Sequence, residues 1–301
     1  MQHHIGTRLW QYLLLVRLPN AFTTPSNVLA GYFAATPPAE ASGVHLAALM
    51  ASSGLLYIAG IALNDYFDIE IDRRERPSRP LPSGNVPKKH AMAIALIALA
   101  AANAITLLAA GPVGLAVSLA LTTMIIAYDY RLKHTAAGPF AMGGSRFLNV
   151  ILGTSPAISV ALLAGAGVQL EIAVFAAASL FAYVVAITLL SKKEVGGERP
   201  SQLPSLMIFA AIAAIAAIGL TSLRWEFLIS LSIFAAVMII TFRQHLAAGS
   251  PSVQKAVRNM VISIIILDSV FVSGTAGLPY GLATLLFIAP AVILAKKLYV
   301  T

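Results

Sequence analysis

Long apolar runs separated by short polar segments make up most of the 301-residue chain. A transmembrane helix needs about 20 consecutive, mostly apolar residues, and ten stretches approach or exceed that length. We expect the first stretch to remain in the mature protein as a helix. The last two stretches have the least defined path, so nine spans is the alternative. The predicted spans are 10–35, 44–64, 90–110, 112–127, 139–165, 171–190, 203–220, 225–241, 253–275 and 279–298.

The composition supports a membrane protein. Hydrophobic residues make up 58% of the chain and charged residues only 11%, whereas about a quarter of the residues in a soluble protein are charged. An ordinary soluble enzyme and a disordered protein are therefore excluded. With no cysteine, disulfides and thiol nucleophiles are excluded as well. The sequence predicts an all-α, polytopic helical bundle that forms a single domain over residues 1–301.

The positive charges lie in alternate loops. The net charge of +8 could indicate a nucleic-acid partner, but in so apolar a chain the retention of Lys and Arg in cytoplasmic loops explains it better. If Arg8 is cytoplasmic, the loops that follow each even-numbered span are basic. The opposite loops carry mainly Glu40, Glu171 and Glu226. We therefore expect the charged loops in the cytoplasm and no nucleic-acid partner.

The most informative segment follows the second span and begins Asn64-Asp65-Tyr66-Phe67-Asp68. Asn64, Asp68 and Asp72 are spaced i, i+4, i+8, which places three oxygen-bearing side chains on one face of a helix. Oxygen ligands of this kind suit Mg²⁺, which keeps several waters and shares the remaining positions with phosphate oxygens. A solvated, anionic helix end is the alternative.

A run of arginines comes directly after these carboxylates, in a segment that is stiffened by three prolines. One guanidinium group can donate two parallel hydrogen bonds to phosphate oxygens. We therefore expect Arg73, Arg76 and Arg79 to contact a diphosphate. The alternative for the arginines alone is an ordinary basic cytoplasmic loop. Metal-binding carboxylates beside phosphate-binding arginines indicate a ligand that carries a diphosphate.

A second charged loop follows the sixth span. Lys192 and Lys193 precede Glu194 and Glu198, which are again four residues apart. We expect the two lysines to contact phosphate and the two glutamates to assist metal binding. On its own this composition is common in cytoplasmic loops. It is informative because it repeats the combination of acidic and basic residues that follows the second span.

Further polar residues lie near the ends of other spans. Tyr128 and Lys133 follow the fourth span, and Arg146 and Asn149 are three apart in the fifth. An arginine inside a membrane helix is costly and usually faces a cavity or a partner. The alternative for Arg146, a side chain that extends to the membrane interface, has about equal weight.

Arg17 and Asn20 are also three apart in the first span, so they can share a helix face. An interfacial helix start is an equally good interpretation of this pair. Asp268 is isolated in an apolar run. An intramembrane carboxylate suggests a functional role, although a structural hydrogen bond to a neighbouring helix explains it equally well.

The first motif resembles the first signature of the UbiA superfamily of intramembrane prenyltransferases. The segment from Arg76 to Gly84, the Tyr128-to-Lys133 segment and the charged loop after the sixth span support this resemblance. It implies a helical bundle around a central cavity and Mg²⁺ on an isoprenyl diphosphate. It also implies a lipophilic or aromatic acceptor that an allylic carbocation alkylates, and a multi-pass protein of a bacterial inner membrane.

The chain departs from the superfamily pattern in its second signature, because Ser191 stands where the first aspartate is expected. The departures are similar to those of EboC-like proteins, a subgroup whose acceptor is unsettled. On this resemblance, Asp68 and Asp72 are catalytic metal ligands that act with Asn64 and are helped by glutamates of the second loop. Lysines and arginines, among them Lys133, contact the diphosphate, and Arg17, Arg146 and Asn149 line the acceptor side. Lys133 and Arg146 are also expected to be catalytic, and Asn20 and Tyr128 to bind substrate.

Two other functions compete with prenyl transfer. A membrane protein that keeps this fold for binding or export, without turnover, is suggested by Ser191. Another enzyme that acts on lipid diphosphates is disfavoured, because the chain lacks the D-G-x-x-A-R type of motif. A pure ion transporter is also disfavoured, since its intramembrane charges should lie at the midplane of the membrane.

Overall fold

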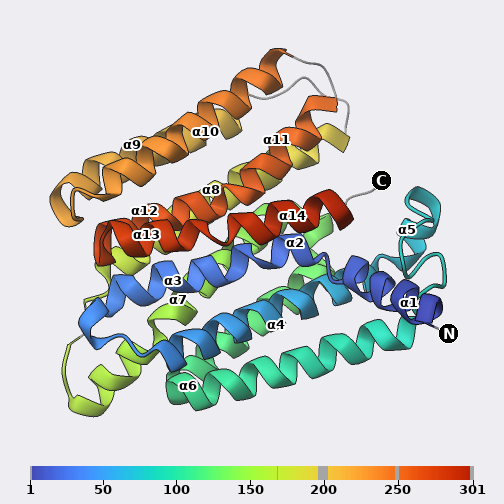
Figure 1. The fold of residues 1–301 in the computed structure, drawn as a ribbon, viewed down its shortest axis with the longest axis horizontal. Coiled ribbons are helices and arrows are strands. Elements are labelled where there is room, and N and C mark those ends of the chain that lie inside the picture. The colour runs from blue at the N-terminus through green and yellow to red at the C-terminus, as the bar shows by residue number, and fades with distance from the viewer. Residues whose placement is uncertain (1, 168, 196–202, 248–250, 299–301) are drawn as a thin grey trace.

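The structure is a computed structural model that describes residues 2–167, 169–195, 203–247 and 251–298 (Figure 1). Within these ranges every regular element is helical, and two short 3₁₀ turns, Pro38–Glu40 and Leu132–His134, connect longer helices. The α-helices are α1 (Gln2–Leu15), α2 (Leu18–Ala21), α3 (Thr23–Ala35), α4 (Gly43–Phe67), α5 (Ile69–Glu75), α6 (Lys88–Tyr130), α7 (Gly138–Ala164), α8 (Glu171–Val195), α9 (Leu203–Ser222), α10 (Phe227–Ala247), α11 (Pro251–Ile262), α12 (Ile264–Ala276), α13 (Leu278–Leu285) and α14 (Ile288–Leu298).

The long helices run side by side as one bundle (Figure 1). Five helical segments among the described residues have the length and apolarity needed to cross a membrane, and three further apolar helices are shorter. Many large apolar side chains, such as Leu108 and Leu163, are exposed on the outside of the bundle, as lipid contact requires. The predicted all-α, polytopic architecture is confirmed.

Several predicted spans are broken. The first consists of α1, α2 and α3, and the last two consist of α11 with α12 and of α13 with α14. The third and fourth predicted spans form α6, which kinks at Gly111, where φ is 66° and ψ is −161°. The Nδ2 atom of Asn103 donates to Thr122 Oγ1 at 3.2 Å across the two halves. The halves therefore fold back on each other as the predicted pair of spans.

A close crossing of α3 and α7 positions much of the site. A Cβ added at Gly31 would collide with the backbone of Val150, and a Cβ added at Gly153 would collide with the backbone of Val28. Only glycine allows such an approach. The polar residues at the start of α3 therefore lie directly against those of α7.

The long polar segment between α4 and α6 is ordered. Leu81 and Val86 are almost fully buried, and they pack with Leu15 of α1, Ile69 of α5 and Ala91 of α6 in a small apolar cluster. This packing agrees with the prediction of an ordered segment at one end of the bundle, whereas its role in ligand binding stays a prediction. Figure 1 shows α5 at that end, beside α1.

Candidate functional site

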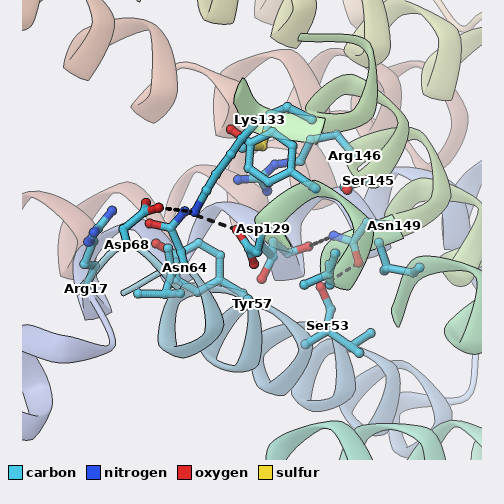
Figure 2. Close-up of a pocket in the computed structure, with 18 of the residues that line it drawn as sticks. Arg17, Ser53, Tyr57, Asn64, Asp68, Asp129, Lys133, Ser145, Arg146 and Asn149 are labelled. Atoms are coloured by element: carbon cyan, nitrogen blue, oxygen red, sulfur yellow. Dashed lines mark hydrogen bonds and ion pairs between the residues drawn. The ribbon is translucent and has the colours of Figure 1, made fainter. Parts of the chain in front are cut away.

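A pocket of about 630 Å³ opens where the ends of several helices meet. Charged and polar groups line part of it, and apolar side chains such as Leu56 and Ile125 line another part (Figure 2). The polar and charged lining residues are Arg17, Thr24, Ser53, Tyr57, Asn64, Asp68, Arg76, Tyr128, Asp129, Lys133, His134, Ser145, Arg146, Asn149 and Ser191. The pocket therefore offers both a charged region and an apolar surface.

Two carboxylates face one lysine in the charged region. Asp68 Oδ1 lies 2.7 Å from Lys133 Nζ and 3.7 Å from His134 Nε2. Asp129, near the end of α6, accepts a hydrogen bond of 3.1 Å from the Asn64 side chain. Figure 2 shows Asn64, Asp68, Asp129 and Lys133 converging at this point.

Asp68 occupies the break between α4 and α5, with φ −87° and ψ 2°. The helical repeat of hydrogen bonds continues across the break, because Asp68 N donates to Asn64 O at 3.0 Å and Asp72 N donates to Asp68 O at 2.8 Å. The predicted i, i+4, i+8 alignment is thus present in the backbone, but only Asn64 and Asp68 line the pocket.

Asp72 takes part in a buried ion-pair group instead. Its Oδ2 atom lies 2.6 Å from Arg79 Nη1, and Arg79 Nη1 also lies 3.8 Å from Asp65 Oδ1. Arg17 Nη2 completes the group at 2.6 Å from Asp65 Oδ1. Asp65 and Asp72 are only 3% exposed, so this group fastens the polar segment to α4.

Replacing Arg79 by methionine should destabilise this group. Asp65 and Asp72 would remain buried with less positive charge beside them, and breaking such a pair costs several kcal/mol. Because Arg79 is one quarter exposed, we discount the loss to about 2 kcal/mol. We expect a lower melting temperature in detergent and faster proteolysis between α5 and α6. The matched control is Arg73→Met, because among the described residues Arg73 forms an ion pair only with the exposed Glu70. An equal loss in both variants would contradict a fastening role for Arg79.

Arg17 is the only non-glycine residue with positive φ among the described residues, at φ 44° and ψ 51°. A left-handed conformation costs a non-glycine residue about 1 kcal/mol or more. The ion pair to Asp65 helps to hold this conformation, and it places Arg17 in the pocket wall. Arg17 and Arg76 thus add positive charge near Lys133.

A second polar group lies two turns into α7. The Arg146 guanidinium donates to Thr23 O at 3.2 Å, to Asn27 Oδ1 at 3.0 Å and to Thr23 Oγ1 at 3.0 Å. The Asn149 side chain donates to Thr24 O at 2.9 Å and accepts from Ser53 Oγ at 2.8 Å. The close crossing of α3 and α7 makes these contacts possible.

The structure brings many of the predicted site residues together, but not all of them. Arg73, Asp72, Arg79 and Asn20 do not line the pocket. Glu198 and the side chains of Lys192, Lys193 and Glu194 lie outside the described part of the chain. The predicted residues that do line the pocket are Arg17, Asn64, Asp68, Arg76, Tyr128, Lys133, Arg146 and Asn149.

Sequence reasoning missed Asp129 as a site residue. It precedes Lys133 by four residues, a spacing that could have indicated a shared helix face. It also missed Asn27 and Ser53, which are uncharged and fully or almost fully buried. Nothing in their local sequence distinguishes them from ordinary polar residues in a membrane helix.

The residues present fit a magnesium ion. Asn64, Asp68 and Asp129 supply oxygen ligands of the kind that Mg²⁺ prefers. The Lys133 ammonium lies beside Asp68, so the Asp68 carboxylate already has one positively charged neighbour. No group of three His, Cys, Asp or Glu side chains is placed to hold a metal among the described residues. An ion here would therefore have few protein ligands and would share its other positions with water and phosphate, as Mg²⁺ commonly does.

Known proteins resemble both the sequence and the fold. A digeranylgeranylglyceryl phosphate synthase of Ignicoccus hospitalis is 38% identical over 130 residues, 42% of this chain and 41% of the relative. The corresponding protein of Saccharolobus solfataricus is 30% identical over 155 residues, 50% of each chain. This chain thus spans half or less of the length of these relatives. A UbiA homologue from Archaeoglobus fulgidus, solved with GPP and Mg²⁺, aligns with a TM-score of 0.67 at 19% identity, over 91% of this chain and 99% of that chain.

The family relationship follows from the sequence itself. The match to the model of the UbiA prenyltransferase family extends over residues 25–191, more than half of the chain. This region contains the Asn64–Asp68 motif, the Tyr128-to-Lys133 segment and Arg146. The protein therefore belongs to the UbiA prenyltransferase family.

Proposed function

We propose that the chain is a Mg²⁺-dependent membrane prenyltransferase. It would move an isoprenyl group from a prenyl diphosphate to a lipophilic acceptor. The observation that carries the proposal is the convergence of Asn64, Asp68, Asp129 and Lys133 in one pocket that also has apolar walls. The family match and the names of the relatives support the same reaction.

Asn64, Asp68 and Asp129 would hold Mg²⁺, which when bound neutralises charge on the diphosphate and makes it a better leaving group. Arg17, Arg76 and Lys133 would bind the diphosphate oxygens, since guanidinium and ammonium groups form charge-assisted hydrogen bonds to phosphate. The Lys133 ammonium would exchange its partner, from the Asp68 carboxylate to phosphate. Asp72 and Asp65 would act only by holding the polar segment in place.

The apolar part of the pocket would hold the prenyl chain. Leu56, Ile61 and Ile125 lie along it, and their side chains exclude water from the allylic carbon. The C–O bond to the diphosphate breaks and its electron pair leaves with the diphosphate. The acceptor forms the new bond to the allylic carbon and loses a proton, which the departing diphosphate can accept. The acceptor itself is not identified by these residues.

The charged end of the bundle would face the cytoplasm, where a soluble prenyl diphosphate is available. The excess of Lys and Arg in the loops at that end supports this orientation. We extend the proposal to a bacterial inner membrane and to one domain over residues 1–301. The similarity to EboC-like proteins stays a prediction.

The proposal is tested with purified protein in detergent and labelled geranylgeranyl diphosphate. We expect binding that requires Mg²⁺ and is lost when EDTA is added. We also expect product when a membrane extract supplies acceptors. Binding that is unchanged by EDTA would contradict the assignment of a metal-assisted site.

A binding protein without turnover is the second candidate. Ser191 lines the pocket and its hydroxyl donates to Thr188 O at 3.0 Å, so a neutral group occupies the position where a carboxylate is expected. This candidate predicts Mg²⁺-dependent binding of the prenyl diphosphate without product. Release of several equivalents of diphosphate per protein in the presence of acceptor would exclude it.

A further inference from the structure

Helix α1 has an apolar face that is turned away from the rest of the protein. Leu9 is 59% exposed and Trp10 is 39% exposed. Leu13 follows Leu9 by four residues, so these three side chains share one face of the helix. The opposite face packs inward, because Leu15 is fully buried in the small apolar cluster of the polar segment and Tyr12 packs against that cluster. An exposed apolar face of this kind indicates a surface that another partner covers.

Helix α1 does not extend the line of α3 through a membrane. It has 14 residues and is about 21 Å long, whereas the hydrocarbon core of a bilayer is about 30 Å thick. It is followed by the left-handed turn at Arg17. Figure 1 shows α1 turned away from the direction of α3, beside α5 at the charged end of the bundle. The exposed apolar face of α1 therefore lies at the level of the charged segments.

The first turns of α6 show where this level lies relative to lipid. Tyr12 Oη lies 2.7 Å from His90 Nδ1, and the two rings stack with their centroids 6.2 Å apart. Lys88 and Lys89 are exposed in this first turn of α6. Seven residues after His90, about 10 Å along the helix axis, Ile97 is 69% exposed. The surface of α6 thus changes from charged to apolar just beyond its contact with α1.

These features fit a lipid leaflet better than water or a second copy of the chain. Amphipathic helices and tryptophan side chains prefer the boundary between lipid headgroups and acyl chains, and exposed lysines at that level attract anionic headgroups. Lys88 Nζ also lies 4.4 Å from the centre of the Tyr66 ring, which holds this charge at the rim. Water would leave the apolar face of α1 solvated. A symmetric contact between two copies would bring the lysines of both chains close together.

We propose that α1 is a membrane-surface helix that docks on a leaflet containing anionic phospholipids. Leu9, Trp10 and Leu13 enter the boundary between headgroups and acyl chains, and Lys88 and Lys89 face the anionic headgroups. Surface helices of this kind bury their apolar face about 5–10 Å deep. The inner face of α1 then holds the polar segment between α4 and α6 close to the membrane. The proposal does not depend on prenyl transfer.

The test uses the fluorescence of Trp10. The chain has two tryptophans, so Trp225→Phe leaves Trp10 as the single reporter. The protein is reconstituted in vesicles of equal parts phosphatidylcholine and phosphatidylglycerol, brominated in the upper or the lower part of the acyl chains. Because the insertion is shallow, we expect upper bromines to quench the emission by about half and lower bromines to quench it much less. Emission that neither set changes would overturn the proposal, and so would emission that changes only when the protein is diluted with lipid, which indicates a second copy.

Moving the tryptophan along α1 separates a surface helix from a spanning one. Leu9→Trp and Leu13→Trp are each made in the protein that also carries Trp10→Phe and Trp225→Phe. On a surface helix the two positions lie at the same depth, so the ratio of upper to lower quenching should be equal. In a spanning helix four residues differ in depth by about 6 Å, so unequal ratios would overturn the proposal. Melting temperatures measured on the same samples show that each variant is folded.

The role of the lysines is tested with brominated lipid of one headgroup at a time. We expect brominated phosphatidylglycerol to quench Trp10 about 2-fold more than the same fraction of brominated phosphatidylcholine, because the lysines enrich anionic lipid beside α1. The double variant Lys88→Gln/Lys89→Gln should lose this difference. The matched control Arg131→Gln/Lys255→Gln removes two exposed charges from other helix ends and should keep it. Equal quenching by both lipids in the parent protein would overturn the anionic preference, and a difference that survives in the lysine variant would overturn the assignment to Lys88 and Lys89.

Discussion

Asp68→Asn is expected to reduce the rate of prenyl transfer at least about 100-fold, which corresponds to about 2.7 kcal/mol of transition-state stabilisation. Asp68 is the carboxylate that contacts Lys133 and lines the pocket. An amide keeps its shape but removes the negative charge that would hold Mg²⁺ beside the diphosphate. The measurement is the initial rate of product formation, together with the Mg²⁺ concentration that gives half-maximal binding of the prenyl diphosphate.

The matched control for Asp68 is Glu70→Gln. Glu70 lies two residues away, is 72% exposed and, within the part of the chain that the structure describes, forms an ion pair with Arg73 alone. It carries the same charge on the same segment, but it does not line the pocket. We expect transfer by this variant at the wild-type rate. Equal losses in both variants would mean that only the total charge of the segment matters, and the assignment of Asp68 as a ligand would then be wrong.

The arrangement of the acidic motif could be predicted only in part. The spacing of Asn64, Asp68 and Asp72 correctly indicated a continuous helical repeat. It did not indicate which of them reach the pocket, because this depends on the break at Asp68 and on where the chain returns after α5. That return places Arg79 against Asp72, a contact between residues seven apart that helix periodicity does not predict.

The deeper part of the site shows a second limit of sequence reasoning. Hydropathy predicted the helices, since lipid contact imposes long apolar runs. It also made Arg146 and Asp268 stand out as charges in apolar surroundings. Hydropathy could not show that Arg146 and Asp268 belong to one polar group, because the two residues are linked through Asn27 of a third helix. Contacts among three helices depend on how closely the helices approach, and glycines at particular positions control that distance.

Gly153→Val should therefore damage both stability and the site. The added side chain would collide with the backbone of Val28, and backbone atoms cannot move aside as a flexible side chain can. We expect a loss of about 3 kcal/mol, the upper end of the usual cost of overpacking. Because Asn27 precedes Val28, separation of α3 from α7 should also disturb its contacts with Arg146 and Asn149. The measurements are the melting temperature in detergent and the Mg²⁺-dependent affinity for the prenyl diphosphate, since Arg146 and Asn149 line the same pocket.

Gly54→Val is the matched control, because a Cβ added at Gly54 of α4 meets no atom within 4 Å. Both substitutions exchange a helical glycine of the membrane region for the same apolar residue, so any difference between them reports the close crossing and not helix propensity. We expect Gly54→Val to melt within a few degrees of the wild type and to bind the prenyl diphosphate normally. A Gly153→Val protein with wild-type stability and normal binding of the prenyl diphosphate would mean that α3 and α7 can separate freely. The contacts of Thr23 and Asn27 with Arg146 would then not depend on the two glycines at the crossing.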